Sequence, residues 1–183
     1  RLASTNHKIK VTSSPYVSLP FLRYRNPSFK MTFDLAEFKK KFAAADDIPA
    51  LLASDFYDKA MGGTDPAWSL WRCTYDYADD TETLDAAKEI SASFLKNTEA
   101  CRSDVFGVMV VLEPGLDVEG LWLVKGADPE ETLFGKCGDT SWFSWSQLGP
   151  AMLDPVKKEV EALWGAKDSF NGKTVADKQV LTE

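Results

Sequence analysis

The chain has 183 residues and a formal net charge of −7, and 44% of its residues are hydrophobic, so it is long enough to be one domain with a real core. No apolar run is long enough to cross a bilayer, which excludes a membrane-spanning protein. Its three cysteines, Cys73, Cys101 and Cys137, are odd in number and far apart, which excludes a disulfide framework and predicts a soluble protein of a reducing, cytoplasmic compartment.

Residues 1–30 form a basic tail or linker, with six Lys or Arg residues and no Asp or Glu. Residues 31–183 hold the other fifteen basic residues against all 28 acids, a net charge of −13, which argues against direct DNA binding and favours basic partner surfaces. Three interpretations of residues 1–30 remain open: a solvated linker, a transit-like segment whose helix Pro15 and Pro20 would break, or an extension ahead of a natural start at Met31.

Residues 31–183 are predicted to form a single compact domain that begins with two helices. Asp34 can cap the first helix, Glu37 follows at its third position, and three consecutive lysines near its end suit the helix dipole. The second helix is expected to start after Asp47 and to stop at Gly62, because its apolar residues recur at helical spacing between these two points.

Four segments have the alternating or continuous apolar pattern of β-strands. They are Trp68–Tyr77, Val105–Leu112, Val118–Lys125 and Trp142–Ser146. Residues 84–102 are predicted to be a short strand or turn followed by a helix, with Ile90, Phe94 and Leu95 facing inward. Another helix should begin at Asp154-Pro155, and the polar segment from Phe170 should be a short extended arm. Hairpins mixed with irregularly spaced helices predict an α+β fold, an antiparallel sheet of about five strands flanked by helices.

The predicted domain lacks histidine, the side chain on which many catalytic and metal sites depend, and no Tyr, Lys or carboxylate is singled out for catalysis by a motif. The single histidine of the chain, His7, lies in the basic tail, so Ser-His-Asp, Cys-His and His-based metal sites are not expected in the domain. Gly172-Lys173-Thr174 lacks the upstream glycine of a phosphate-binding loop, because Lys167 stands there, and is predicted to be a turn. We therefore predict no catalytic, cofactor-binding or metal-binding residues. Cys137 stays the one candidate for a reactive thiol.

All six tryptophans lie in the predicted domain. Trp68 and Trp71 are three residues apart on one strand and must point to opposite faces of the sheet, and Trp142 and Trp145 repeat this offset. One member of each pair is expected in the core, and the other under a helix or on the surface, where tryptophan often marks an interface. The candidate interaction surface consists of Trp68, Trp71, Tyr75, Trp122, Lys125, Trp142 and Trp145.

Several segments match, in order, the pattern of one family. They are TFDLAEFKKKF, Ser69-Leu70-Trp71 with Tyr75 beyond it, Phe106, Gly120–Gly126, Trp142–Leu148, Asn171-Gly172 and Val180-Leu181. Taken together over nearly all of residues 31–183, they resemble the C-terminal domain of elongation factor 1-gamma. The family's Leu-Asp-Pro corresponds either to Leu148-Gly149-Pro150 or to Leu153-Asp154-Pro155.

The resemblance implies a role in translation elongation. The gamma subunit belongs to the eukaryotic complex that recharges the aminoacyl-tRNA-delivering factor with GTP, and nucleotide exchange belongs to other subunits. The resemblance implies a compact domain without established catalysis. We expect a non-catalytic docking or scaffold domain whose partners are other subunits of the complex, with the ribosome, the cytoskeleton or a membrane as further candidates.

Two other functions stay open at this point. The chain could be a thiol-dependent transferase-type enzyme, which would need one of its cysteines to be a low-pKa thiolate. Alternatively, the basic residues 1–30 could tether the protein to RNA or to an anionic membrane.

Overall fold

Six antiparallel strands form one sheet in the order β4-β1-β3-β2-β6-β5. The structure is a computed structural model that describes residues 33–62 and 67–182. The strands are β1 Trp68–Tyr75, β2 Val105–Glu113, β3 Asp117–Lys125, β4 Phe143–Gln147, β5 Ser169–Phe170 and β6 Lys173–Val180. The predicted α+β fold is confirmed, with one strand more than expected. The basic tail lies outside the described residues.

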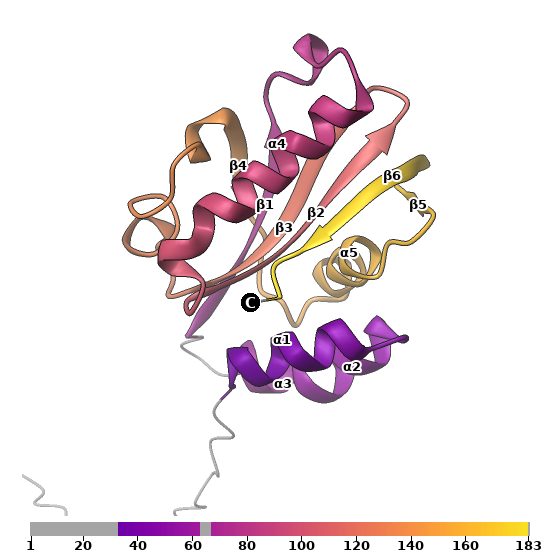
Figure 1. Cartoon of the computed structure of the whole chain (residues 1–183). Coiled ribbons are helices and arrows are strands. Elements are labelled where there is room, and N and C mark those ends of the chain that lie inside the picture. The colour runs from indigo at the N-terminus through magenta and orange to yellow at the C-terminus, as the bar shows by residue number, and fades with distance from the viewer. Residues whose placement is uncertain (1–32, 63–66, 183) are drawn as a thin grey trace, which may run out of the picture.

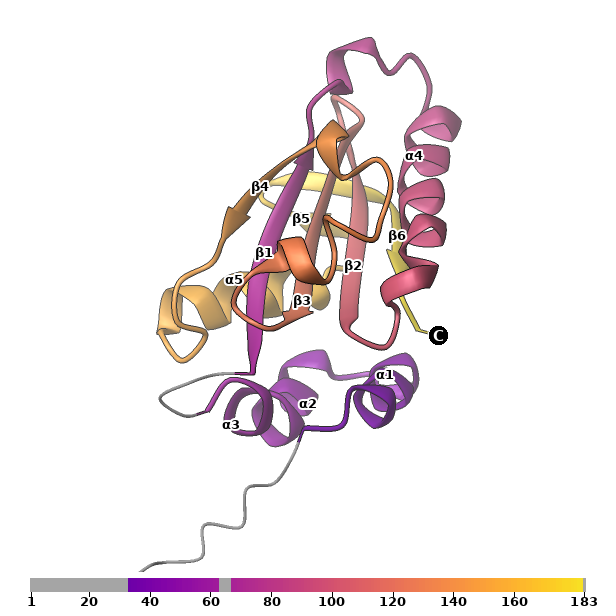
Figure 2. The same ribbon diagram turned by 90° about the vertical axis from the view of Figure 1, so that its left-hand side faces the viewer.

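Helices cover both faces of this sheet (Figures 1 and 2). One face carries α4, and the other carries α5 together with the three helices near the N-terminus. The helices are α1 Leu35–Ala44, α2 Ile48–Asp55, α3 Tyr57–Ala60, α4 Leu84–Asn97 and α5 Asp154–Trp164, and the short 3-10 turns are η1 Ala78–Asp80, η2 Thr98–Cys101, η3 Pro129–Glu131 and η4 Thr140–Trp142. In the described parts of the chain, no helix has the length and apolarity needed to cross a membrane.

Side-chain caps set the starts of three helices. Asp34, Asp47 and Thr83 each accept a hydrogen bond from the backbone N–H three residues on, at 3.0, 3.0 and 3.2 Å. The first two caps confirm the predicted starts of α1 and α2. The third corrects the prediction for residues 84–102: because Thr83 caps the helix directly, α4 begins at once, with no short strand before it.

The sheet separates two hydrophobic cores, and β2 contributes to both. Every residue of Val105–Leu112 is buried, as predicted for a strand covered on both faces. The α5-side core includes Phe38, Phe42, Phe56, Leu70, Phe106, Leu121 and Trp164. The α4-side core includes Cys73, Phe94, Met109, Trp122, Leu133, Cys137 and Phe143.

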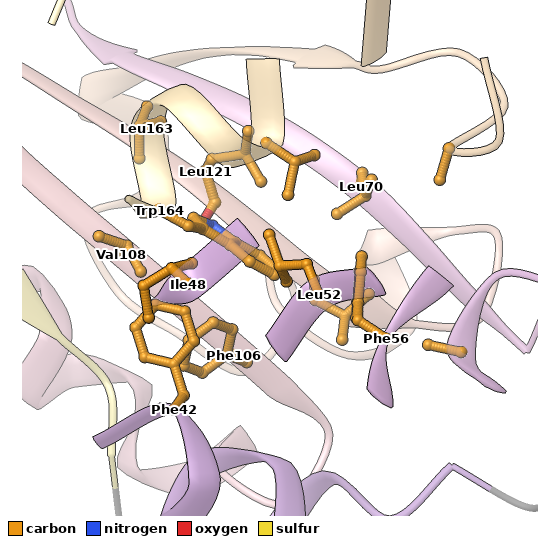
Figure 3. Close-up of a cluster of buried hydrophobic side chains, with 14 of the residues drawn as sticks. Phe42, Ile48, Leu52, Phe56, Leu70, Phe106, Val108, Leu121, Leu163 and Trp164 are labelled. Carbon is orange, nitrogen blue, oxygen red and sulfur yellow. The ribbon is translucent and has the colours of Figure 1, made fainter. Parts of the chain in front are cut away.

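Trp164 at the end of α5 lies at the centre of the α5-side core (Figure 3). Its ring packs edge-on against Phe106 and Phe56, with centroids 4.9 and 5.1 Å apart. Its Nε1–H donates a 3.0 Å hydrogen bond to the carbonyl oxygen of Leu121 in β3. The indole therefore joins α5, the sheet and the N-terminal helices while its one polar atom remains satisfied.

The polar C-terminal segment is part of the sheet, so the prediction of a short extended arm is wrong. Asn171 and Gly172, both with positive φ, form the two-residue turn that joins β5 to β6. Strand β6 then pairs with β2, from Val108 opposite Val180 to Glu113 opposite Thr174.

Lys178 helps to explain why the polar strand β6 can pair with the buried strand β2. Its ammonium group donates hydrogen bonds to the carbonyl oxygens of Trp164 and Ala166, at 2.6 and 3.0 Å. These carbonyls lie at the C-terminal end of α5, where a helix lacks intrahelical donors and favours a cation. The lysine stem thus packs inward and its charge caps the helix.

Candidate functional site

The tryptophans of the predicted interaction surface have very different exposures. Trp68 and Trp71 point to opposite faces of the sheet, as predicted, one to each core. Trp68 is 8% exposed and Trp122 is fully buried, so these two are not available to a partner in this fold. Trp142 is 47% exposed, while Trp145 is half-buried.

Lys125 lies at the opposite end of the sheet from Trp142. It is paired across the strands with Trp68, whereas the backbone N–H of Asp76, beyond the other end of β1, donates to the carbonyl oxygen of Trp142 at 3.0 Å. The ammonium of Lys125 binds the carboxylate of Asp104 at 3.0 Å. The seven predicted residues therefore do not form one continuous surface, because β1 and β3 separate them along their length.

Five aromatic side chains form a cluster along β4, on the α4 side: Trp71, Tyr75, Phe134, Phe143 and Trp145. Phe134 contacts both Trp71 and Trp145, with ring centroids 6.1 and 5.1 Å apart. Tyr75 packs edge-on against Phe143 at 5.4 Å. Phe134 was not among the predicted residues, because it lies in the irregular segment between β3 and β4, where no periodicity marks a buried side.

The polar atoms of the two half-buried indoles are satisfied. Trp71 Nε1–H donates to Ser69 Oγ at 2.9 Å, and this hydroxyl donates in turn to the carbonyl oxygen of Gly126 at 2.7 Å. Trp145 Nε1–H donates to the carbonyl oxygen of Thr140 at 3.0 Å. These bonds fasten the segment between β3 and β4 to the sheet and hold the aromatic cluster in place.

The end of this cluster opens to solvent at a site that we call the β4 corner, which consists of Tyr75, Asp76, Tyr77, Asp80 and Trp142. Tyr77 is 50% exposed, and its ring lies 5.8 Å from that of Tyr75. Asp76 Oδ1 accepts a hydrogen bond from the backbone N–H at the second residue of β4, at 3.1 Å. Burial raises the pKa of Tyr75, and the nearby Tyr77 and Asp80 add to the shift.

The β4 corner combines exposed aromatic side chains with a run of acidic residues. Asp76, Asp79, Asp80 and Glu82 are all exposed, and no Lys or Arg lies between Arg72 and Lys88 in the sequence. The guanidinium of Arg72 is occupied by Glu119 and Glu159, at 2.6 and 3.0 Å. Sequence reasoning missed Tyr77, which it placed inside a strand, although β1 ends at Tyr75.

The three cysteines are free and buried. Cys137 is therefore not the solvated loop thiol that its glycine-rich surroundings suggest: its Sγ atom lies 2.8 Å from that of Cys101. The hydrogen bond from Cys137 lowers the pKa of Cys101, and the same contact raises the pKa of Cys137. Burial raises the pKa of Cys73. Within residues 33–62 and 67–182, no cluster of His, Cys, Asp and Glu could hold a metal ion.

The chain is similar to a family model and to several known proteins, and all of them carry the same family name. A family model described as "Elongation factor 1 gamma, conserved domain" matches residues 25–128. Elongation factor 1-gamma 3 and 2 of Oryza sativa subsp. japonica are 29% and 30% identical to the chain over 113 residues, which cover 60% of the chain and 27% of each relative. Elongation factor 1-gamma of Prunus avium is 29% identical over 113 residues, 60% of the chain and 26% of the relative. The aligned part of the chain thus spans about a quarter of the length of these relatives.

Proposed function

The chain belongs to the elongation factor 1 gamma family, whose conserved-domain model matches more than half of it, and on this basis we propose that it is a non-catalytic docking domain of the gamma subunit of the translation elongation factor 1 complex. Its partners are other subunits of that complex, in the cytoplasm. The domain holds these subunits together and so supports guanine-nucleotide exchange that the other subunits perform.

The β4 corner is the observation that carries this proposal. Tyr77 and Trp142 are two of the four large hydrophobic side chains that the described residues expose. They border an aromatic cluster fixed by hydrogen bonds, and exposed aromatic side chains on a rigid support are typical of interface centres. The acidic groups around them favour a partner with a basic surface.

The environment of the thiols argues against the alternative of a thiol-dependent enzyme. A nucleophilic cysteine needs a thiolate that substrate can reach. Cys73 and Cys101 are fully buried and Cys137 is 6% exposed. The one thiol whose pKa is lowered, Cys101, owes this to a second buried thiol rather than to a neighbouring base.

Binding measurements with the full 183-residue chain test the docking function. We expect it to bind purified subunits of the elongation factor 1 complex, and the double variant Y77A/W142A to weaken this binding about thirtyfold, because loss of interface hot spots costs about 2 kcal/mol or more. The matched control is M152A/L153A, which removes the other two exposed hydrophobic side chains, 42% and 53% exposed, and should bind normally.

Further binding experiments distinguish docking from the alternative functions. Ribosomes, tubulin and vesicles with anionic lipid serve as competing partners. The chain could instead bind vesicles or RNA in a salt-sensitive way, and this binding could disappear when four tail residues are changed to Ser: Lys8, Lys10, Arg23 and Arg25. That result would show that the protein tethers through its basic tail and would refute the docking function. Docking is also refuted if no subunit binds, or if both double variants weaken binding equally.

A further inference from the structure

Strand β4 forms one edge of the sheet (Figure 2), and three of its five residues direct their backbone N–H and C=O groups away from β1. At its two ends, Trp142 accepts from the N–H of Asp76, and Leu148 donates to the carbonyl oxygen of Leu70 at 2.9 Å. Antiparallel pairing alternates along a strand, so the peptide groups of Ser144 and Ser146 also face β1. Those of Phe143, Trp145 and Gln147 face outward.

The N–H of Phe143 donates to the carbonyl oxygen of Thr140 in η4. The N–H groups of Trp145 and Gln147 and the three outward C=O groups have no hydrogen-bond partner among the described residues, since β1 is the only strand that pairs with β4 there. The edge is also accessible, because the side chains of Ser144, Ser146 and Gln147 are exposed. An accessible edge with free peptide groups can accept another strand.

The sequence of β4 contains none of the usual protection against strand addition. Phe-Ser-Trp-Ser-Gln has no charge, no proline and no glycine. The opposite edge of the sheet differs: β6 carries Lys173, Asp177 and Lys178, and β5 covers its first residues. Of the two edges of the sheet that the described residues form, the β4 edge alone combines free peptide groups with a neutral, strand-forming sequence.

The charge around β4 indicates the chemistry of its occupant. The exposed carboxylates of Asp76, Asp79, Asp80 and Glu82 lie where the strand begins, and none of them forms an ion pair within the described residues. The exposed rings of Tyr77 and Trp142 are surfaces on which a guanidinium or ammonium group can stack. An acidic or neutral strand would gain neither interaction.

We propose that the open edge of β4 is a strand-addition site for an extended, basic segment of a partner protein. The segment exchanges backbone hydrogen bonds with Trp145 and Gln147 and donates to the carbonyl oxygen of Phe143, and its Arg or Lys side chains reach the β4 corner. Main-chain bonding supplies affinity and the corner supplies selectivity for basic sequences. This inference deepens the proposed docking function and rests on it.

Amide hydrogen exchange on the full chain tests the site directly. The probe is a synthetic eight-residue peptide of alternating Arg and Val, and its charge control alternates Glu and Val. Adding the Arg peptide should slow exchange of the Trp145 and Gln147 amides. The Phe143 amide, already bonded to Thr140, and the Ser144 and Ser146 amides, already bonded to β1, should change little. The Glu peptide should bind at least about tenfold more weakly. Unchanged exchange at the Trp145 and Gln147 amides, or equal binding of both peptides, overturns the proposal.

A pair of variants at Gln147 isolates the backbone contribution. Gln147→Pro removes one outward N–H without removing a bond to β1, and should weaken binding of the Arg peptide about tenfold. Gln147→Ala keeps that N–H and should bind normally. Equal affinities of the two variants refute pairing through the backbone. The exchange pattern of the unsubstituted chain remains decisive if the proline variant does not fold.

Other occupants of the β4 edge would give distinct results, and each result would overturn the proposal that a partner's strand binds there. Protection of the outward amides without peptide that disappears when the basic residues of 1–30 are changed to Ser identifies the chain's own tail. Protection that depends on protein concentration identifies a second copy. If Y77A/W142A abolishes subunit binding but Gln147→Pro leaves it intact, strand addition is refuted and the docking function is supported. Peptide-induced protection without any subunit binding refutes docking instead.

Discussion

The Sγ atoms of Cys101 and Cys137 lie 2.8 Å apart, joining the 3-10 turn after α4 to the segment that precedes β4. Diamide should convert this pair to a disulfide, taking up the two hydrogens that the thiols lose. We expect the free thiols measured after denaturation to fall from three to about one, because Cys73 lies apart in β1. In Cys137→Ser no thiol should be lost within the monomer. Loss of the Cys73 thiol, or formation of covalent dimers in place of the Cys101–Cys137 disulfide, would contradict the prediction.

Truncation of Trp164 should be among the most costly substitutions in the α5-side core. Trp164→Ala removes a fully buried ring and leaves the carbonyl oxygen of Leu121 without its donor. We expect the free energy of unfolding in urea to fall by about 3–5 kcal/mol. Trp164→Phe retains most of the ring contacts and should cost less. Equal losses for the two variants would mean that the hydrogen bond, not the packing, dominates.

Gly107 in β2 is required by the ring directly across the strand pair. Its cross-strand neighbour is Trp122, and a Cβ at Gly107 would overlap the six-membered ring of this indole. We expect Gly107→Ala to destabilise the fold by about 1–3 kcal/mol in urea unfolding, as overpacking of a core does. Gly138→Ala is the matched control, since a Cβ there would meet nothing within 4 Å. A neutral result at Gly107 would show that the ring can move aside.

Lys39 should make stability depend on alkaline pH. Its side chain is buried and donates a 2.8 Å hydrogen bond to the carbonyl oxygen of Arg102. Burial lowers the pKa of Lys39, and the charge of Arg102 adds to the effect. Between this lowered pKa and the ordinary value of about 10.4, the unfolded chain binds more protons than the folded chain, so this lysine makes stability rise with pH.

Urea unfolding between neutral pH and about pH 10 measures this contribution. Lys39→Met should reduce the rise, whereas Lys40→Met, at an exposed position of the same helix, should leave it unchanged. The prediction concerns the slope with pH, so a constant loss from the missing hydrogen bond does not affect it. Identical slopes in the two variants would count against a lowered pKa.

The candidate site could be predicted only in part. The three-residue spacing of Trp68 and Trp71 correctly placed them on opposite faces, but it could not say that Trp68 is buried beneath the N-terminal helices. Tyr77 and Phe134 lie in irregular segments, where neither a period of two nor one of 3.6 identifies the covered side. Their roles depend on which segments come together in space.

Three features follow from the sequence without knowledge of the fold. They are the start of α1 at its Asp34 cap, the doubly buried strand Val105–Leu112, and the lack of a histidine in residues 31–183. These features depend on neighbouring residues or on composition alone. The tertiary structure decided that polar β6 enters the sheet, that Cys101 meets Cys137, and that β4 lies at an edge. Each of these depends on pairing between distant segments, and a strand's own sequence does not state whether a neighbour will cover its outer peptide groups.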